Sequence, residues 1–312
     1  MSLQYPTSSL PARLAVARPA FDVALAASSS TTKTDLRLTT SRPPSTDARY
    51  GRAEMPALTS QIMGELDRIL EPGRFDDYCV NGLQVPGPAQ VQTIATGVSA
   101  HAELFELAAQ EHTELLLVHH GLFWGPGVRQ IEPTLKRRLQ ILFDANIALA
   151  AYHLPLDAHP DLGNNALLAH ALGAEHLQPF AMHHGQPIGC IAELTADGSG
   201  TGVAADELFA RVQHATAREP LVFDAGPPRV RRLAIVTGAG ADFIADAAGA
   251  GADALLTGEV SERSMAQARE AHVHLISAGH YATETFGVRR LGEHLAGRFQ
   301  LRHVFLDVPN PV

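Results

Sequence analysis

From residue 55 onward, the sequence alternates short apolar runs with amphipathic segments of helical period. In the first half, the expected elements are a helix at 59–70, strands at 93–98, 114–121 and 147–155, and helices at 102–112 and 133–146. In the second half, they are strands at 231–238, 252–259, 272–280 and 301–308 and helices at 241–251, 261–271 and 284–297. Alternation of this kind is typical of parallel sheets covered by helices, so we predict an α/β fold.

The two halves also resemble each other, because residues 94–121 can be laid over 235–260 with a short gap. We therefore expect two similar α/β lobes with mostly parallel sheets flanked by helices. The expected lobes cover 55–174 and 231–312, and residues 175–230 read as a small α+β middle segment. Ligand sites in α/β sheets collect beyond the carboxyl ends of the strands.

Residues 1–54 differ in composition from the rest of the chain. They contain no histidine, are rich in Ser, Thr, Pro and Ala, and carry a net charge of +3, whereas the remainder carries -12. This composition predicts a disordered leader or extension. A transit peptide, which would direct the protein to an organelle, and a start codon assigned upstream of Met55 are the alternatives.

The charge balance argues against several classes of function. With 24 Lys+Arg against 33 Asp+Glu, the chain lacks the basic footprint of a nucleic-acid binder, and the basic run at 136–138 reads as a solvated helix face. Lys33 and Lys136 are the only lysines, and neither stands in a phosphate-binding P-loop, which excludes Walker-type hydrolysis. The sequence around Gly238 and Gly240 lacks the third glycine of a dinucleotide loop.

Cysteine usage and hydropathy suggest a compartment. Cys79 and Cys190 form no CxxC motif, which fits a reducing environment. No apolar run reaches the roughly 20 residues needed to span a bilayer, and no signal peptide is visible. We expect a cytoplasmic protein without membrane or nucleic-acid partners.

Histidine is the side chain in excess, with 16 copies, and one pair of histidines ends a buried strand. His119 and His120 follow the apolar run 115–118 and precede Gly121. Adjacent side chains of a strand point to opposite faces, so both imidazoles serve one site only if the strand ends and turns there. The alternative is one core histidine beside one exposed histidine.

A second polar group follows the strand at 147–155. His153 comes at its end, and Asp157 is the carboxylate best placed beyond it, because Pro155 interrupts the strand. Asp161 and Asn164 are expected to cap the following helix.

The third signal is His280 and Glu284, which are four residues apart at the start of a helix. This spacing puts both on one helix face, where they suit a metal site. A surface hydrogen bond is the alternative.

Together, these signals supply three imidazoles and two carboxylates at the ends of separate strands: His119, His120, Asp157, His280 and Glu284. Five such ligands exceed the needs of one tetrahedral ion and suit two divalent ions with a bridging carboxylate and a bridging water. The mixed N/O set suits Fe, Mn, Zn or Ni.

For two further pairs of ring side chains, the sequence leaves the structural role to be decided. His183 and His184 lack a preceding apolar strand and a carboxylate nearby in sequence, so a solvated loop is expected. Phe123 and Trp124 are expected either to form a pocket wall or to belong to the core.

The sequence resembles the Nif-three-like dinuclear-metal proteins, some of which carry the name type-two GTP cyclohydrolase I. The resemblance covers residues 56–312 and rests on DYCVNGLQVPG, HHGLFWG, YHLPLDAHPDLGNN, LLTGEVSE, AGHYATE and FLDVPNP, in family order. It implies that the five residues above are the ligands of two metals, with Glu284 as the bridge. It also implies a homohexameric toroid with its metal sites facing an inner cavity.

These observations lead to a functional hypothesis with one rival. We expect a dinuclear metal hydrolase whose metal-bridging water attacks an electrophilic carbon, with His153 as a proton shuttle. By resemblance, the small-molecule substrate is a purine nucleotide such as GTP, opened at its imidazole ring. The rival is a non-catalytic metal-binding or metal-delivery protein, or an interaction scaffold, that uses the same ligands.

Overall fold

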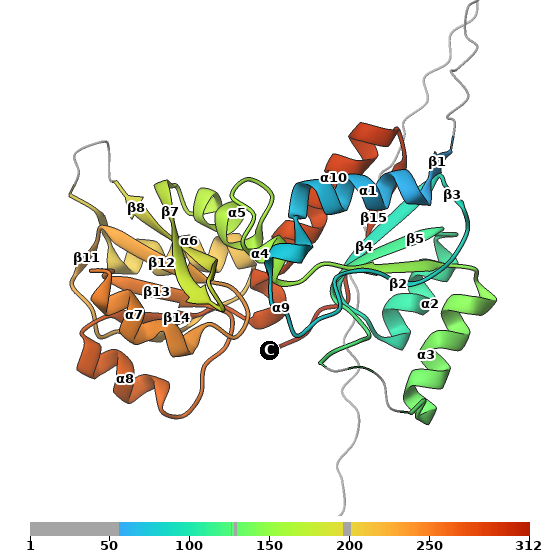
Figure 1. The fold of residues 1–312 in the computed structure, drawn as a ribbon. Coiled ribbons are helices and arrows are strands. Elements are labelled where there is room, and N and C mark those ends of the chain that lie inside the picture. The colour runs from blue at the N-terminus through green and yellow to red at the C-terminus, as the bar shows by residue number, and fades with distance from the viewer. Residues whose placement is uncertain (1–55, 126, 128–129, 196–200) are drawn as a thin grey trace, which may run out of the picture. The chain divides into compact units, whose positions relative to one another are not determined.

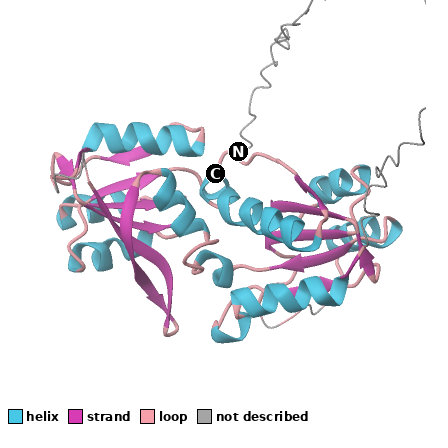
Figure 2. Cartoon of the chain, turned by 90° about the horizontal axis from the view of Figure 1, so that it is seen from above, coloured by secondary structure: helices cyan, strands magenta, loops and turns pink. Residues whose placement is uncertain are grey.

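The computed structural model describes residues 56–125, 127, 130–195 and 201–312 (Figure 1). The leader expected at 1–54 lies outside these residues. Within them, each of two sheets carries helices on both faces, which confirms the predicted α/β class (Figure 2). No helix in this part of the chain is long and apolar enough to cross a membrane.

The first sheet has five strands in the order β15-β4-β5-β6-β2. Its strands are β15 (Arg302–Phe305), β4 (Thr93–Ser99), β5 (Leu115–His120), β6 (Ala148–Ala151) and β2 (Gly82–Val85). All neighbours are parallel except β2, which pairs antiparallel with β6. The central strands β4 and β5 are buried almost throughout, as parallel strands covered on both faces must be.

Four helices cover this first sheet. On one face, α1 (Thr59–Leu70) and α10 (Thr285–Phe299) share an apolar cluster with β4 and β5. On the other face, α2 (Ala102–Gln110) and α3 (Pro133–Asp144) pack together and against the same strands.

The second sheet has six strands in the order β10-β14-β13-β12-β8-β7. Its strands are β10 (Leu221–Phe223), β14 (His274–Ser277), β13 (Ala254–Thr257), β12 (Arg232–Val236), β8 (Gln186–Leu194) and β7 (Ala174–His183). The strands β12, β13 and β14 are parallel to one another, and β10, β8 and β7 pair antiparallel. Helices α5 (Asn164–Ala171) and α6 (Ala205–Thr216) cover one face, and α7 (Ile244–Gly249) and α8 (Ser264–Ala271) cover the other.

Short elements connect these layers. They are β1 (Ala57–Leu58), β3 (Gln90–Val91), β9 (Val203–Ala204), β11 (Arg229–Val230), the 3-10 turns Pro72–Arg74 and Ala241–Phe243, and the one-turn helices α4 (Leu154–Asp157) and α9 (His280–Thr283). The strand expected at 147–155 ends at Ala151, because Pro155 takes one of the first positions of α4 instead of staying extended.

The assignment of segments to the two sheets differs from the lobe boundaries that the sequence predicts. Segment 231–312 does not stay in the second lobe, because β15 pairs with β4 and the apolar face of α10 fills the core of the first sheet. Segment 175–230 is not a separate piece, because β7, β8 and β10 extend the second sheet. This makes the second sheet mixed, where mostly parallel pairing was expected.

Candidate metal centre

The five expected ligands lie together beyond the carboxyl ends of strands from both sheets. His119 and His120 end β5, Asp157 ends α4 after β6, and His280 begins α9 after β14. Glu284 stands between α9 and α10. Residues from separate segments therefore converge, as the strand-end argument predicts.

His119 is completely buried and held in one orientation. Its Nδ1 lies 3.0 Å from the carbonyl oxygen of Tyr152, to which it donates, so Nε2 faces two carboxylates. That Nε2 is 3.4 Å from Asp157 Oδ2 and 3.5 Å from Glu284 Oε1. Both are ion-pair distances, and the atom has no hydrogen-bond partner among the described residues.

The carboxylate of Glu284 lies at the centre of the group, and the residue is 2% exposed. Besides His119, its Oε1 is 3.1 Å from His280 Nε2, and its Oε2 is 3.2 Å from His120 Nε2. One carboxylate thus faces three imidazoles. In the described part of the chain, Oε2 makes no hydrogen bond.

Asp157 is fixed by groups that leave one oxygen for the site. Its Oδ1 accepts from Asn164 Nδ2 at 2.8 Å and from Thr237 Oγ1 at 3.3 Å, whereas Oδ2 faces His119. Asn164 was expected to cap α5, and so was Asp161, but Gly163 is the N-cap. The Asn164 amide instead links Asp157 to α10, because its oxygen accepts from the Gly287 N–H.

The other two imidazoles are more accessible and are held by polar neighbours. His120 Nδ1 is 3.1 Å from Ser99 Oγ, and His280 Nδ1 is 3.5 Å from Glu259 Oε2. The side chains of His120 and His280 are 18% and 26% exposed, so the site opens to solvent on their side.

The imidazoles and carboxylates of the cluster shift one another's pKa values. Burial raises the pKa of Glu284, but His120 and His119 outweigh it and hold that pKa well below its usual range. Burial lowers the pKa of His119, but the Asp157 and Glu284 carboxylates raise it well above its usual range. For His120 burial dominates, and its pKa is lowered. The arrangement therefore keeps anionic carboxylate among the imidazoles.

Three overlapping sets of side chains have ligand atoms within 4.8 Å of one another: His119, His120 and His153; His120, His280 and Glu284; and His119, Asp157 and Glu284. The donor types are imidazole nitrogens and carboxylate oxygens, which suit first-row divalent metals. Two of the donor atoms are also buried without hydrogen bonds. The residues present therefore fit a metal ion.

His153 lies beside the five candidate ligands, and its hydrogen-bond partner Asp77 is a residue that sequence reasoning missed. The His153 ring is 5.0 Å from that of His119, and its Nδ1 is 2.8 Å from Asp77 Oδ1. Asp77 also accepts hydrogen bonds from Asn81 and from the backbone N–H of Leu154. The only signal for Asp77 was its place at the start of the DYCVNG motif, which gives no reason on its own to single out this carboxylate.

Trp124 lies beside two imidazoles of the site and does not belong to the buried cores, which argues against the core alternative left open by the sequence. Its ring centroid is 5.7 Å from that of His120 and 5.1 Å from that of His153, and 42% of the residue is exposed. The indole N–H donates to the Gly121 carbonyl at 2.8 Å. Phe123 instead packs against the first core.

The second histidine pair lies outside the three ligand sets. His183 and His184 stand at the tip of the β7–β8 hairpin with stacked rings 4.2 Å apart. The pair does have a carboxylate nearby in space, because His184 Nδ1 is 2.6 Å from Asp76 Oδ2. His184 and Asp76 are more than half exposed, in keeping with the expected solvated loop. His183 departs from that expectation, because it ends β7 and its Nε2 is buried.

Two glycines make room for the cluster. Gly238 has φ +66°, and a Cβ there would collide with Glu284 Oε1 and come 3.0 Å from His280 Nε2. A Cβ on Gly121 would collide with the Gln84 amide, which accepts from the Leu122 N–H at 2.7 Å. Gly121 therefore serves close packing after His120, without a left-handed backbone.

Sequence comparison places the chain among known proteins. A model of the Duf34/NIF3 (NGG1p interacting factor 3) family matches residues 57–311. A Pseudomonas aeruginosa protein named GTP cyclohydrolase 1 type 2 homolog is 44% identical over 258 residues, which are 82% of this chain and 100% of the relative. An Escherichia coli protein of the same name is 42% identical over 243 residues, covering 78% and 94%.

Solved structures agree with this placement. The structure of protein ybgI, of unknown function, matches with a TM-score of 0.76 and 39% identity, over 82% of this chain and 100% of that one. The structure of TTHA1606 from Thermus thermophilus matches with a TM-score of 0.72 and 35% identity, over the same shares. The chain therefore belongs to the Duf34/NIF3 family.

Proposed function

We propose that this protein is a dinuclear metal-dependent hydrolase. One ion would be held by His119, Asp157 and Glu284, and the other by His120, His280 and Glu284. The observation that carries the proposal is the sharing of Glu284 between two ligand sets, with buried atoms of His119 and Glu284 left without hydrogen bonds. A buried polar atom without a partner is costly, and a bound cation relieves that cost.

The donor set also limits the metal. No thiolate belongs to the three ligand sets, which argues against a structural zinc of the cysteine type. Three imidazoles with two carboxylates suit Fe, Mn, Zn or Ni.

When bound, the two ions would supply a water molecule of lowered pKa, the nucleophile of metal-assisted hydrolysis. The chain supports this use through the unequal exposure of its ligands. His119, Asp157 and Glu284 are buried, whereas His120 and His280 border solvent on one side. A substrate would approach on that side.

We propose that His153 carries a proton for the reaction. The Asp77 carboxylate accepts from Nδ1–H, so Nε2 is free to face the site beside His119 and His120. The imidazole therefore offers an acceptor nitrogen at the edge of the cluster, which is what a proton shuttle requires.

For the substrate, we propose a purine nucleotide opened at its imidazole ring. Two features support it: the relatives named GTP cyclohydrolase 1 type 2 homolog, and the exposed ring of Trp124 beside His120 and His153. An exposed indole offers a face on which a planar base stacks.

Elemental analysis and turnover together test the proposal. The purified, metal-supplemented protein should contain about two ions per chain, and it should consume GTP with loss of the purine absorbance. Absence of metal from every supplemented preparation would refute the metal centre. A two-ion protein that turns over neither GTP nor other nucleotides, phosphoesters and peptides would refute hydrolysis and leave metal delivery, for which transfer to an apo-protein is the assay.

Two further expectations belong to the same proposal. We propose that the protein self-associates into a homohexamer, which sedimentation velocity would test. We also propose a cytoplasmic location and neither nucleic-acid nor membrane partners.

A further inference from the structure

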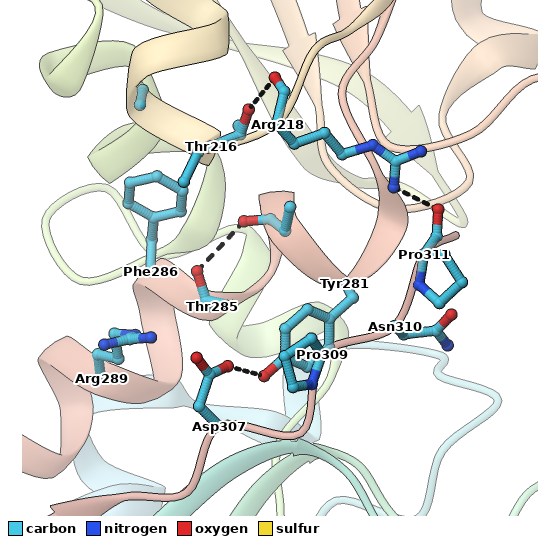
Figure 3. A pocket seen from close by; sticks show the side chains of 13 residues that line it. Thr216, Arg218, Tyr281, Thr285, Phe286, Arg289, Asp307, Pro309, Asn310 and Pro311 are labelled. Carbon is cyan, nitrogen blue, oxygen red and sulfur yellow. Dashed lines mark hydrogen bonds between the residues drawn. The ribbon is translucent and has the colours of Figure 1, made fainter. Parts of the chain in front are cut away.

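A cavity of about 750 Å³ lies away from the ligand sets, beside α9. Three segments surround it: the C-terminal end of α6, the start of α10 with α9, and residues 307–311 (Figure 3). Its volume is that of a pocket for a small organic ligand.

Much of the lining is apolar. Phe286 and Ala282 come from the helical side, Ala215 from the end of α6, and Pro309 from the chain beyond β15. Figure 3 shows the Phe286 ring on the side of the cavity bordered by α6. These surfaces would accept an aromatic or aliphatic group.

Arg218 supplies positive charge from the α6 side. Its Nη1 donates to the Pro311 carbonyl, and its side chain lies against Gly279, where an added Cβ would be 2.7 Å from Nη1. Among the described residues, it has no carboxylate partner within ion-pair distance. A carbonyl oxygen carries no net charge, so this guanidinium keeps its capacity for an anion.

Arg289 supplies a second guanidinium, from α10. Its Cζ lies 3.5 Å over the ring of Phe305, a cation–π contact that leaves the edge of the guanidinium group free. It too lacks a carboxylate partner in the described part of the chain. Figure 3 shows Arg218 and Arg289 on different sides of the cavity, with Thr285 between them.

One carboxylate limits the charge of a ligand. Asp307 also lines the cavity and accepts from Tyr281 Oη at 2.6 Å. Two guanidinium groups and one side-chain carboxylate line the cavity. Beside them, the Tyr281 N–H donates to a main-chain oxygen of Val312, the last residue, at 3.0 Å, which adds further negative charge at this edge. The cavity therefore suits an anion of low charge better than a polyphosphate.

We propose that this cavity is a second binding site, for a small organic oxyanion that carries an aromatic or apolar group. A carboxylate and a phosphate monoester share the chemistry that Arg218 and Arg289 recognise, namely planar or forked N–H donors against negatively charged oxygens. The apolar walls would hold the remainder of the ligand.

This site is distinct from the metal centre although both use α9. His280 and Glu284 face the ligand sets, whereas Tyr281, Ala282 and Thr285 line the cavity. Successive helical residues are about 100° apart, so the two groups occupy different faces. The inference does not depend on the proposed hydrolysis.

Isothermal titration of the full-length, metal-loaded protein tests the proposal with three probes: benzoate, phenyl phosphate and benzyl alcohol. Benzoate or phenyl phosphate should bind, and more weakly at high salt, and the tighter of the two identifies the preferred anion. Benzyl alcohol should bind at least about tenfold more weakly, because it lacks the charge. No binding of either anion, or equal binding of benzyl alcohol, would overturn the proposal.

Variants locate the binding. Arg289→Gln and Arg218→Gln should each weaken binding about tenfold or more, which corresponds to the loss of one charge-assisted hydrogen bond. Arg290→Gln is the matched control, since Arg290 is next in α10, pairs with Glu293 and does not line the cavity. If Arg218→Gln fails to fold, Arg289→Gln alone decides. Equal loss in Arg290→Gln, or loss in Glu284→Gln, would show that the anion binds elsewhere and overturn the proposal.

Discussion

The Nδ1 atom of His153 lies 2.8 Å from Oδ1 of Asp77, a carboxylate that is 2% exposed and 76 residues away in sequence. The same carboxylate accepts from three other donors, on Cys79, Asn81 and Leu154. Burial raises the pKa of Asp77, but the hydrogen bonds from His153, Asn81 and the Cys79 N–H help to lower that pKa below its usual value. Asp77 is therefore an anionic acceptor that orients His153.

Asp77→Asn should destabilise the protein by about 2 kcal/mol, because its amide N–H₂ would face donors that now meet an oxygen. The ring tautomer of His153 should also shift away from Nδ1–H, while the metal content stays unchanged. Chemical denaturation and ¹⁵N NMR of the histidine rings measure the two effects. Asp76→Asn is the matched control: this exposed neighbour contacts His184, and its loss should cost less than about 0.5 kcal/mol. Equal effects of the two variants would contradict an orienting role for Asp77.

Glu284→Gln should reduce the metal content from about two ions per chain to one or none, since a neutral amide is a poor bridge between two cations. Metal analysis by mass spectrometry measures the change. Glu293 lies on α10 in an exposed ion pair with Arg290 and serves as the control. The Glu293→Gln variant should keep the full metal content. Unchanged metal in Glu284→Gln would argue against a shared bridge.

Gly238→Ala should destabilise the fold by about 1–2 kcal/mol from its left-handed backbone alone, and it should also lower the metal content by pushing Glu284 aside. Gly249→Ala in α7 is the control: nothing lies within 4 Å of the new methyl group. There alanine should be neutral or stabilise by up to about 1 kcal/mol. Thermal unfolding together with metal analysis distinguishes the two, and a metal-replete Gly238→Ala would refute the crowding argument.

Glu65 of α1 contacts His294 of α10, and its lowered pKa makes the stability of the protein depend on pH. Its hydrogen bond from Arg68 lowers its pKa to about 2, although burial opposes this, and His294 adds a further contact at 3.3 Å. A lowered acid pKa stabilises the folded state above the unfolded pKa of about 4.3 and loses that contribution as the pH falls toward 2. Because Arg68 is largely exposed, we expect a contribution on the order of 1 kcal/mol.

The Glu65→Gln variant should therefore be less stable than the parent at pH 7, and the gap should close between about pH 4.5 and 2. Urea titrations at several pH values measure it. Glu71→Gln removes a similar i,i+3 pair with Arg74 whose two side chains are both more than half exposed, and it should change stability by less than about 0.5 kcal/mol. A constant gap across this pH range would contradict the assignment.

Local patterning predicted most elements, because buried strands such as β4 and β5 are continuous apolar runs bounded by helices of clear period. It did not predict which sheet each element joins. The strand β15 pairs with β4 across more than 200 residues, and no feature of 301–308 distinguishes that partner from β14. Pairing of this kind depends on which sheet edge and which apolar face remain free.

The candidate site was more predictable than the topology, since strand ends of parallel sheets meet at one edge. His119, His120, Asp157, His280 and Glu284 do converge. Asp77 escaped because its loop follows no strand, and Asn164 was misassigned because a helix-start asparagine looks like a cap from sequence alone. Contacts that orient ligands come from distant segments and leave no local pattern.

The return of α10 and β15 to the first sheet has a consequence for biosynthesis. His119 and His120 leave the ribosome long before Glu284, and the apolar face of α10 reaches the first core only after residue 299 has been made. A nascent chain therefore presents two imidazoles without the carboxylate that joins them. Under the proposed function, metal loading with the complete donor set would be a late, post-translational event, coupled to closure of the first core.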